Sequence, residues 1–371
     1  MNQICCLNPN CDNPSVPDTN RLCPKCQKPL VLLRHRYRPV KSLGQGGFGK
    51  TYLAMDNDKF GETCVIKQLA PQAGSTAAVQ KAQQLFEQEA RQLQNLQHPQ
   101  IPDLKAYFSE GSYFYFVQDF IEGDNLLGEL KRGIFDEQKT IKFLNELLPV
   151  LKYIHDRGIV HRDIKPENMM RQRSDGRLFL IDFGVSKQLQ GTIYTGTSIG
   201  TFGYAPLEQM QDGKVYPASD LFSVGATCFH LLTGMHPWEV WRLKGYGWVQ
   251  EWRQHLKKPV SSQFGTVLDK LLALYPEQRY QSAVDVLNAF NEEDTVVEVS
   301  YRGYVRRLPP KTAESRSRLS EDITVETEED FPIATYRTTT AQQMVILNRM
   351  GKAYPLNVAD IPGGSARSRG V

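Results

Sequence analysis

Two short segments near the middle of the chain hold the side chains best suited to chemistry, namely 161–168 (HRDIKPEN) and 182–184 (DFG). Asp163 can orient a hydroxyl group and accept its proton, and Lys165 can neutralise a phosphoryl group in transit. Asn168 and Asp182 offer the hard oxygen ligands that Mg²⁺ prefers. Phosphoryl transfer needs alignment and charge neutralisation rather than covalent chemistry, and these two segments predict it.

A glycine-rich segment and a lysine lie upstream of these residues. The run Gly44-Gln45-Gly46-Gly47-Phe48-Gly49 falls between two predicted strands, which favours a flap over phosphates rather than a dinucleotide-binding turn. Lys67 lies in an apolar strand and needs a partner, because an unpaired buried charge is costly. Glu89, on the helix predicted next, is the candidate, and the pair can hold the α- and β-phosphates. The alternative is a surface lysine at a strand edge.

The predicted elements divide into a strand-rich front and a helix-rich back. Hydrophobic periodicity predicts two strands joined by the glycine-rich turn over 37–60, further strands over 63–69 and 113–120, and helices over 80–97 and 138–157. This order predicts two lobes with a cleft between them.

On these motifs, residues 37–292 resemble a eukaryotic-type (Hanks-type) serine/threonine protein kinase domain. The resemblance implies an α+β, bilobal fold with a small β-rich N-lobe, a large helical C-lobe, and ATP and Mg²⁺ in the cleft. Lys165 followed by Pro166 is the serine/threonine pattern, so Ser and Thr hydroxyls of proteins are the implied substrates. The implied catalytic set is Asp163, Lys165 and Thr201, with Asn168 and Asp182 as Mg²⁺ ligands.

The resemblance also assigns the residues that bind ATP and those that support the site. The ATP set is Leu43, Gly44, Gln45, Gly46, Gly47, Phe48, Gly49, Thr51, Lys67, Glu89, Gln118, Asp119 and Ile121. Asp220 corresponds to the aspartate that braces the catalytic loop, and Arg279 to the arginine that pairs with a glutamate, here Glu208. Two departures stand out: the segment before that glutamate reads Ala205-Pro206-Leu207 instead of Ala-Pro, and Thr51 replaces the usual valine.

Five of the seven cysteines fall before residue 27, in a segment with too few apolar residues to fold without a staple. The spacing Cys6-x4-Cys11 and Cys23-x2-Cys26 predicts two knuckles that hold one Zn²⁺ as four thiolates. Cys5 can substitute for Cys6 or remain free, and a reversible thiol switch is the alternative to structural zinc. Residues 1–30 also resemble the four-cysteine segment of a group of bacterial, chiefly cyanobacterial, kinases, which implies a zinc-ribbon-like module that docks on the kinase or a partner.

The segment between Gly184 and Glu208 is rich in hydroxyl side chains. In kinases with an arginine directly before the catalytic aspartate, as Arg162 is here, a phosphate on this segment commonly orders the segment. We therefore expect autophosphorylation, with Thr192, Thr195, Thr197 and Ser198 as candidates and Thr195 or Thr197 preferred. A solvated loop that is merely rich in threonine is the alternative.

The composition of the chain limits the partners and the location that we expect. A net charge of +3 is too small to indicate a dedicated nucleic-acid or membrane partner, and the chain start has no signal-like pattern. No apolar run approaches the roughly 20 residues of a membrane span, so we expect a cytoplasmic protein without membrane insertion. Residues 31–36 form a linker, and 293–371 are expected to be a polar, mostly disordered tail, with a short helix possible over 338–350. Nothing in the sequence indicates the oligomeric state.

Three rival functions are weighed against a protein kinase. A pseudokinase scaffold usually lacks the equivalent of Lys67, Asp163 or Asp182, and all three are present. A small-molecule phosphotransferase of related fold typically lacks the glycine flap and the threonine-bearing segment. A metal or redox sensor with the kinase as its output differs only in emphasis, and the sequence does not separate the two.

Overall fold

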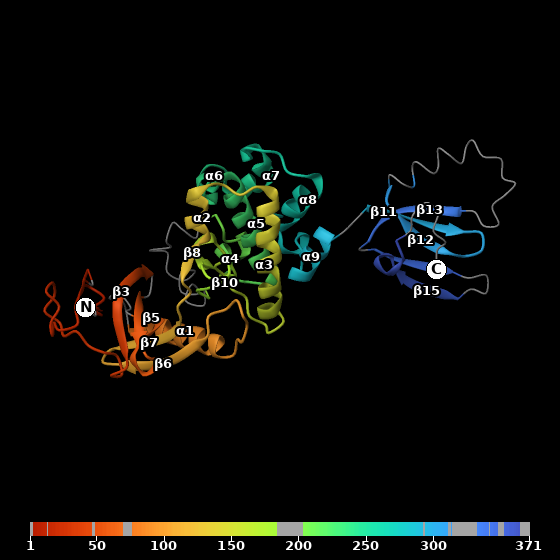
Figure 1. The fold of residues 1–371 in the computed structure, drawn as a ribbon. Helices are drawn as coiled ribbons and strands as arrows, with labels where there is room; N and C mark the ends of the chain where they lie inside the picture. Colours follow the sequence, from red (N-terminus) through yellow and green to blue (C-terminus); the bar gives the residue numbers. More distant parts are fainter. Residues whose placement is uncertain are drawn as a thin grey trace. The chain divides into compact units, whose positions relative to one another are not determined.

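A computed structural model describes residues 3–12, 14–46, 49–69, 76–183, 203–291, 294–310, 313, 332–340, 342–347 and 352–363. The chain forms two compact units, Met1–Val284 and Asp285–Val371 (Figure 1). None of the helices in these described residues is long and apolar enough to cross a membrane.

A five-stranded antiparallel sheet forms the front of the first unit, in the order β3-β4-β5-β7-β6. Its strands are β3 (Tyr37–Gly46), β4 (Gly49–Asp56), β5 (Glu62–Leu69), β6 (Leu104–Glu110) and β7 (Tyr113–Asp119). The helix α1 (Thr76–Gln94) packs on one face, where the Phe86 and Phe116 rings lie 4.9 Å apart. The strands and helix that the sequence predicts are present here, and β6 is an additional strand.

The opposite face of this sheet is also covered. Alternate residues of β4, including Lys50, Tyr52 and Ala54, are buried, so this face of the strand is covered. The cover is the cysteine segment, which contains the short strands β1 (Gln3–Cys5) and β2 (Ser15–Pro17). One apolar cluster joins the segment and the sheet, and it is made of Cys5, Leu7, Leu33, Tyr37, Tyr52, Ala54, Cys64, Ile66, Phe108, Tyr115 and Val117. The sheet therefore has two buried faces.

The back of the first unit is helical, as the sequence predicts. Its helices are α2 (Leu126–Arg132), α3 (Glu137–His155), α4 (Leu207–Gln211), α5 (Pro217–Thr233), α6 (Pro237–Lys244), α7 (Trp248–Glu251) and α8 (Ser262–Leu271). Helix α9 (Ala283–Asn291) begins at the end of this unit and continues into the second. A small sheet, β8 (Gly123–Asn125), β9 (Met169–Gln172) and β10 (Leu178–Leu180), accompanies them. Helix α5 is buried along nearly its whole length, which explains its apolar sequence. It includes Cys228, and both Cys228 and Cys64 are buried in the apolar core.

The second unit differs from the expected polar tail. Its described residues form β11 (Asp294–Ser300), β12 (Val305–Leu308), β13 (Pro332–Thr339), β14 (Gln343–Leu347) and β15 (Ala353–Asn357). Strand β11 pairs with β12 and β13, and β14 pairs with β15. The helix expected over 338–350 is wrong, because this stretch holds the end of β13 and all of β14. Its apolar residues pack in strands rather than along one helical face.

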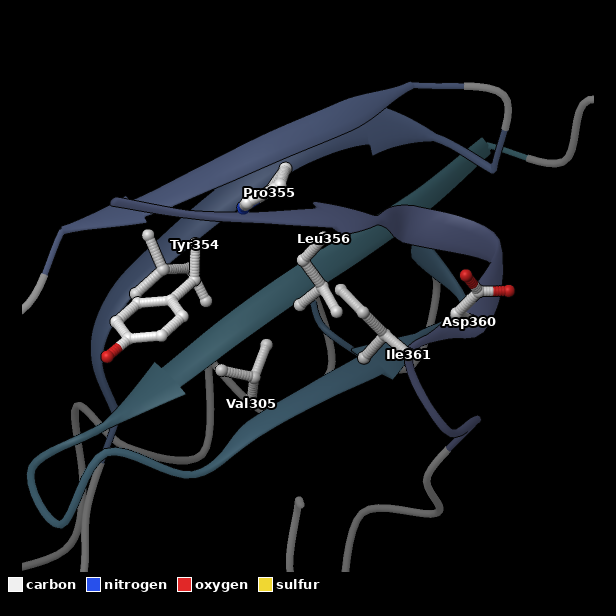
Figure 2. Close-up of a pocket in the computed structure, with 7 residues that line it drawn as sticks. Val305, Tyr354, Pro355, Leu356, Asp360 and Ile361 are labelled. Carbon is white, nitrogen blue, oxygen red and sulfur yellow. The ribbon is translucent and has the colours of Figure 1, made fainter. Parts of the chain in front are cut away.

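A small apolar core holds this second unit together. Val297, Val305, Val358 and Ile361 are buried, with Val299, Met344, Ile346 and Leu356 packed around them. The core opens into a hollow of about 290 Å³, and the side chains of Leu356, Ile361 and Val305 point into it (Figure 2). Burial between paired strands gives this polar segment enough apolar contact to order.

The packing of the cysteine segment on the sheet generates a test of stability. Leu7 is 8% exposed within the shared apolar cluster, whereas Leu22, in the same segment, is 49% exposed. We expect Leu7→Ala to destabilise the protein by about 2–5 kcal/mol, because it leaves a cavity, and Leu22→Ala to change little. Thermal and urea unfolding of the full chain measure both. Equal stability of the two variants would show that the segment does not pack on the sheet.

Candidate active site

A buried lysine joins the front sheet to α1 and to the DFG segment. Lys67 projects from β5, and its Nζ lies 3.1 Å from Glu89 Oε1 on α1 and 2.5 Å from Asp182 Oδ1. Burial lowers the pKa of Lys67, but the Asp182 and Glu89 carboxylates outweigh that effect and hold the pKa above its usual range. The lysine therefore stays charged, as a group that binds phosphates must.

The segment around Asp163 forms a second cluster of polar contacts. The Asn168 amide nitrogen donates to Asp163 Oδ2 at 2.6 Å and to the Asp163 carbonyl at 2.8 Å. Lys165 Nζ lies 3.4 Å from the same carboxylate oxygen. Both Asp163 and Asn168 are buried, and the lysine side chain is 12% exposed. These contacts fix the direction of the carboxylate before any substrate arrives.

Asp220 braces this loop from α5. Its carboxylate is fully buried and accepts the backbone N–H groups of His161 and Arg162, each at 2.8 Å. His155 Nε2 contacts the same carboxylate at 2.9 Å. Arg162 has a φ of 69°, a left-handed conformation that is strained for a residue other than glycine. The two hydrogen bonds to Asp220 hold the loop in that conformation.

A ring contact links the two motifs to each other. The His161 and Phe183 rings lie 4.8 Å apart, and His161 Nε2 lies 3.1 Å from the Ile181 carbonyl. Burial lowers the pKa of His161, so the imidazole is neutral at physiological pH. Asp182 itself has a φ of 58°, which directs its carboxylate back toward Lys67. The sequence pattern alone indicated no role for His161 or Phe183, although both stand inside the 161–168 and 182–184 segments.

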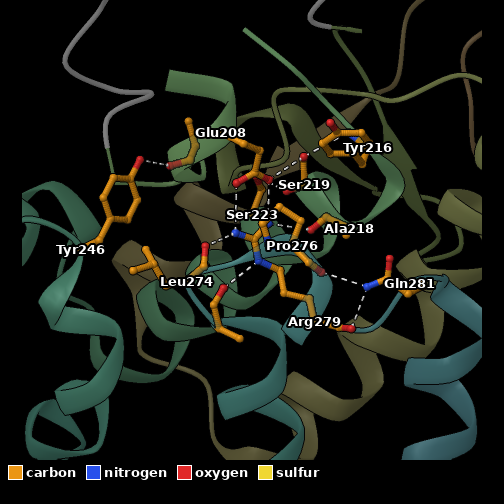
Figure 3. A network of polar contacts seen from close by, with 12 residues as sticks. Glu208, Tyr216, Ala218, Ser219, Ser223, Tyr246, Leu274, Pro276, Arg279 and Gln281 are labelled. Atoms are coloured by element: carbon orange, nitrogen blue, oxygen red, sulfur yellow. Dashed lines mark hydrogen bonds and ion pairs between the residues drawn. The ribbon is translucent and has the colours of Figure 1, made fainter. Parts of the chain in front are cut away.

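The end of the threonine-rich segment is anchored by a buried ion pair. Arg279 Nη1 lies 2.7 Å from Glu208 Oε1, and Nη2 lies 3.1 Å from Oε2, so the pair is bidentate. Figure 3 shows the guanidinium surrounded by further acceptors, which include the Ala273 and Leu274 carbonyls. Ser219 Oγ donates to Glu208 at 2.7 Å. Glu208 therefore keeps its anchor although Leu207 departs from the usual pattern.

The other expected nucleotide-binding residues lie along the front sheet. Leu43, Gly44, Gln45 and Gly46 end β3, Gly49 and Thr51 begin β4, and Gln118 and Asp119 end β7, with Ile121 just beyond. Gln118 and Ile121 are buried, and Asp119 forms an ion pair with Lys105 at 2.7 Å. Gly47, Phe48, Thr201, Thr192, Thr195, Thr197 and Ser198 lie outside the described residues.

The four cysteines predicted as ligands come together. The sulfur atoms of Cys6, Cys11, Cys23 and Cys26 all lie within 4.8 Å of one another. This spacing and an all-sulfur donor set fit a tetrahedral Zn²⁺. Cys5 lies in the apolar cluster under the sheet instead, where burial raises the pKa of its thiol to about 12. Of the two possibilities for Cys5, the structure therefore favours a thiol outside the ligand set.

Two local features complete the cysteine site. Hydrogen bonds from the Asn8 side chain and the Lys28 backbone lower the pKa of Cys26 to about 6, which favours the thiolate that a metal requires. Gln27, where the knuckle pattern usually has glycine, adopts a φ of 58°. The turn thus keeps its left-handed geometry without the glycine, at some cost in backbone strain.

Comparisons with known proteins agree with this site. Residues 37–289 match the family model described as "Protein kinase domain". "Serine/threonine-protein kinase B" of Synechocystis sp. is 42% identical over 297 residues, which cover 76% of this chain and 51% of that protein. "Serine/threonine-protein kinase PknA" of Nostoc sp. is 40% identical over 269 residues, covering 70% and 47%. The chain thus spans about half the length of these relatives.

Solved structures show the same architecture. The structure titled "PpkA-294 apo form" has a TM-score of 0.58 and 26% identity, and the match covers 68% of this chain and 95% of that one. The kinase domain of Mycobacterium tuberculosis PknI has a TM-score of 0.51 at 21% identity, covers 69% and 95%, and supports the fold alone. The bilobal fold predicted from the motifs is confirmed, and the chain belongs to the protein kinase family.

Proposed function

We propose that this protein is a serine/threonine protein kinase that transfers the γ-phosphate of ATP to serine and threonine hydroxyls of other proteins. The observation that carries the proposal is the contact of one buried lysine, Lys67, with both Glu89 and Asp182. This arrangement joins the front sheet, α1 and the DFG segment in the form that phosphate binding requires.

The side chains present fit ATP and Mg²⁺. Lys67 provides a fixed positive charge, and Asp182 and Asn168 provide oxygen donors of the type that Mg²⁺ prefers. Because the Asn168 amide nitrogen is committed to Asp163, its oxygen is the atom available to a metal ion. When bound, ATP supplies the phosphoryl group and Mg²⁺ offsets its charge.

The residues of the loop would act on the incoming hydroxyl. Asp163 orients the hydroxyl and takes its proton, and its direction is already set by Asn168. Lys165, near the same carboxylate, neutralises charge on the group in transit. Thr201 would contact Asp163 from the threonine-rich segment between Gly184 and Glu208, here called the activation segment. Leu43 and Ile121 would cover the adenine.

Serine and threonine are the proposed acceptors for two reasons. Pro166 follows Lys165, which is the serine/threonine pattern, and the relatives named as serine/threonine kinases are about 40% identical to this chain. A pseudokinase scaffold is the main rival. It is disfavoured because Lys67, Asp163 and Asp182 are all present and in contact with the partners that a kinase needs.

We also propose that the four-cysteine site holds one Zn²⁺ ion. A region with so few apolar residues gains its fold from the metal, and the thiolates must be deprotonated to bind it. Free buried thiols and metal-bound thiolates are typical of a reducing compartment, which supports a cytoplasmic location.

The zinc site can be tested by metal analysis of the full chain. We expect one Zn²⁺ per chain in protein purified without chelators, and loss of that metal in Cys11→Ala, because a ligand is removed. Cys5→Ala is the matched control and should keep the metal, since Cys5 lies outside the ligand set. Metal-free protein with disulfides between these cysteines would instead support the thiol-switch alternative.

Kinase activity can be tested by incubating the full chain with ATP and Mg²⁺ beside an Asp163→Ala control. We expect phosphoserine or phosphothreonine in the wild type only, because the variant cannot orient the hydroxyl. Mass spectrometry should place phosphate on Thr192, Thr195, Thr197 or Ser198, with Arg162 as the proposed partner of the modified residue.

Two results would contradict parts of this proposal. No phosphate on the chain or on generic protein substrates, despite tight ATP binding, would support the scaffold. Phosphate confined to other positions would refute the activation-segment sites while leaving the kinase activity established.

A further inference from the structure

Two polar side chains fasten the kinase sheet to the first cysteine knuckle. Lys50 Nζ donates to the Cys11 carbonyl at 2.6 Å, and Gln68 Nε2 donates to the Leu7 carbonyl at 2.9 Å. Lys50 and Gln68 are direct partners across the β4–β5 ladder, so they stand side by side on the same face of the sheet. Both are buried, at 7% and 1% exposure.

Their neighbours in the chain belong to the phosphate site. Lys50 follows Gly49, the last glycine of the flap, and Gln68 follows Lys67. Successive residues of a strand face opposite sides of the sheet. Lys50 and Gln68 therefore face the cysteine segment, whereas Gly49 and Lys67 face the side that would hold the phosphates. The knuckle is therefore fastened directly behind the two strands that would hold the phosphates.

The carbonyls that Lys50 and Gln68 bind lie beside the proposed metal ligands. Leu7 follows Cys6, and Cys11 is itself one of the four cysteines, so a bound Zn²⁺ would fix both ends of the segment that Lys50 and Gln68 bind. A buried lysine is stabilised by acceptors, because a buried charge without one is costly. If the knuckle opened, the contact of Lys50 with the Cys11 carbonyl would be lost, and the start of β4 would lose that support.

Further contacts attach the same module to β3. Ser15 Oγ donates to the Val40 carbonyl at 2.6 Å, and Asp18 pairs with Arg38 at 3.1 Å. Leu7 also enters the apolar cluster of the sheet. The module thus supports both strands of the β3–β4 hairpin that carries the glycine flap.

We infer that the metal-loaded four-cysteine module holds the phosphate-binding hairpin in place from behind, and that Lys50 is the positioning residue that transmits this support. This inference rests on the proposed function, because it requires a nucleotide in the cleft. This inference gives the module a role in ATP affinity in addition to its role in folding.

The test compares nucleotide binding by full-length wild type and Lys50→Met with Mg²⁺ present. We expect the Kd for a non-hydrolysable ATP analogue to rise about tenfold, since a hydrogen bond from a charged donor is lost. The Kd for adenosine should stay within about twofold, because adenosine has no phosphates. Lys59→Met is the matched control, since Lys59 lies at the other end of the β4–β5 hairpin and is 47% exposed; it should bind like the wild type.

A second arm removes the metal instead of the lysine. Chelation of the wild type should weaken ATP-analogue binding at least as much as Lys50→Met does, because it loosens the Lys50 contact together with the other contacts of the module. The combined effect of chelation and the variant should be smaller than the sum of the two separate effects, because both act on the Lys50 contact. Lys50→Arg keeps a charged donor and should bind the ATP analogue like the wild type. The metal content should be unchanged in both Lys50 variants. If Lys50→Met does not fold, the chelation and Lys50→Arg measurements still test the inference.

The outcomes separate this inference from the proposed function. Unchanged ATP-analogue affinity in Lys50→Met, or additive effects of the variant and chelation, would overturn the inference while leaving the kinase intact. Equal losses for adenosine and the ATP analogue would also overturn it, because they would show general destabilisation. A wild type that binds no nucleotide would instead refute the proposed function.

Discussion

The buried positive charge of Lys67 is the constraint on which the cleft depends. A lysine at this depth is stable only when carboxylates face it, and Glu89 and Asp182 come from elements far apart in the sequence. The charge therefore ties β5, α1 and the DFG segment into one arrangement. The positive charge that holds these elements together is also the charge that would bind phosphates in the proposed function. One side chain therefore serves both the fold and the proposed chemistry.

A second set of buried polar groups holds the loop opposite. Asp220 fixes the backbone on either side of the His161–Arg162 peptide bond, and the Asn168 amide fixes the Asp163 carboxylate. Both Asp220 carboxylate oxygens and Asp163 Oδ2 accept hydrogen bonds, which offsets the cost of burying these atoms. The strained left-handed backbone at Arg162 is tolerated because these bonds over-determine it. The direction of the Asp163 carboxylate is thus fixed by contacts within the chain.

The front sheet shows how a small module can become part of a larger fold. Residues 3–33 have too few apolar side chains for a core of their own, yet Leu7 and Cys5 add theirs to the sheet. In return, the module covers a face that would otherwise expose Tyr52 and Ile66. The four clustered cysteines, which would hold the proposed metal, and the shared apolar cluster are complementary supports, one local and one provided by the kinase lobe.

By itself, the sequence determined the family and the two lobes, and it predicted that the four cysteines come together. Phosphoryl transfer demands particular side chains in a particular order, and the four cysteines lie in two closely spaced pairs along the chain. What only the tertiary structure decided depends on non-local contacts. The Lys50 and Gln68 bonds to the knuckle join residues about 40 to 60 positions apart, and no periodicity predicts them. The strands of the second unit escaped prediction for the same reason, because Val297 of β11 is buried against Val305, Val358 and Ile361, which come from other parts of this unit.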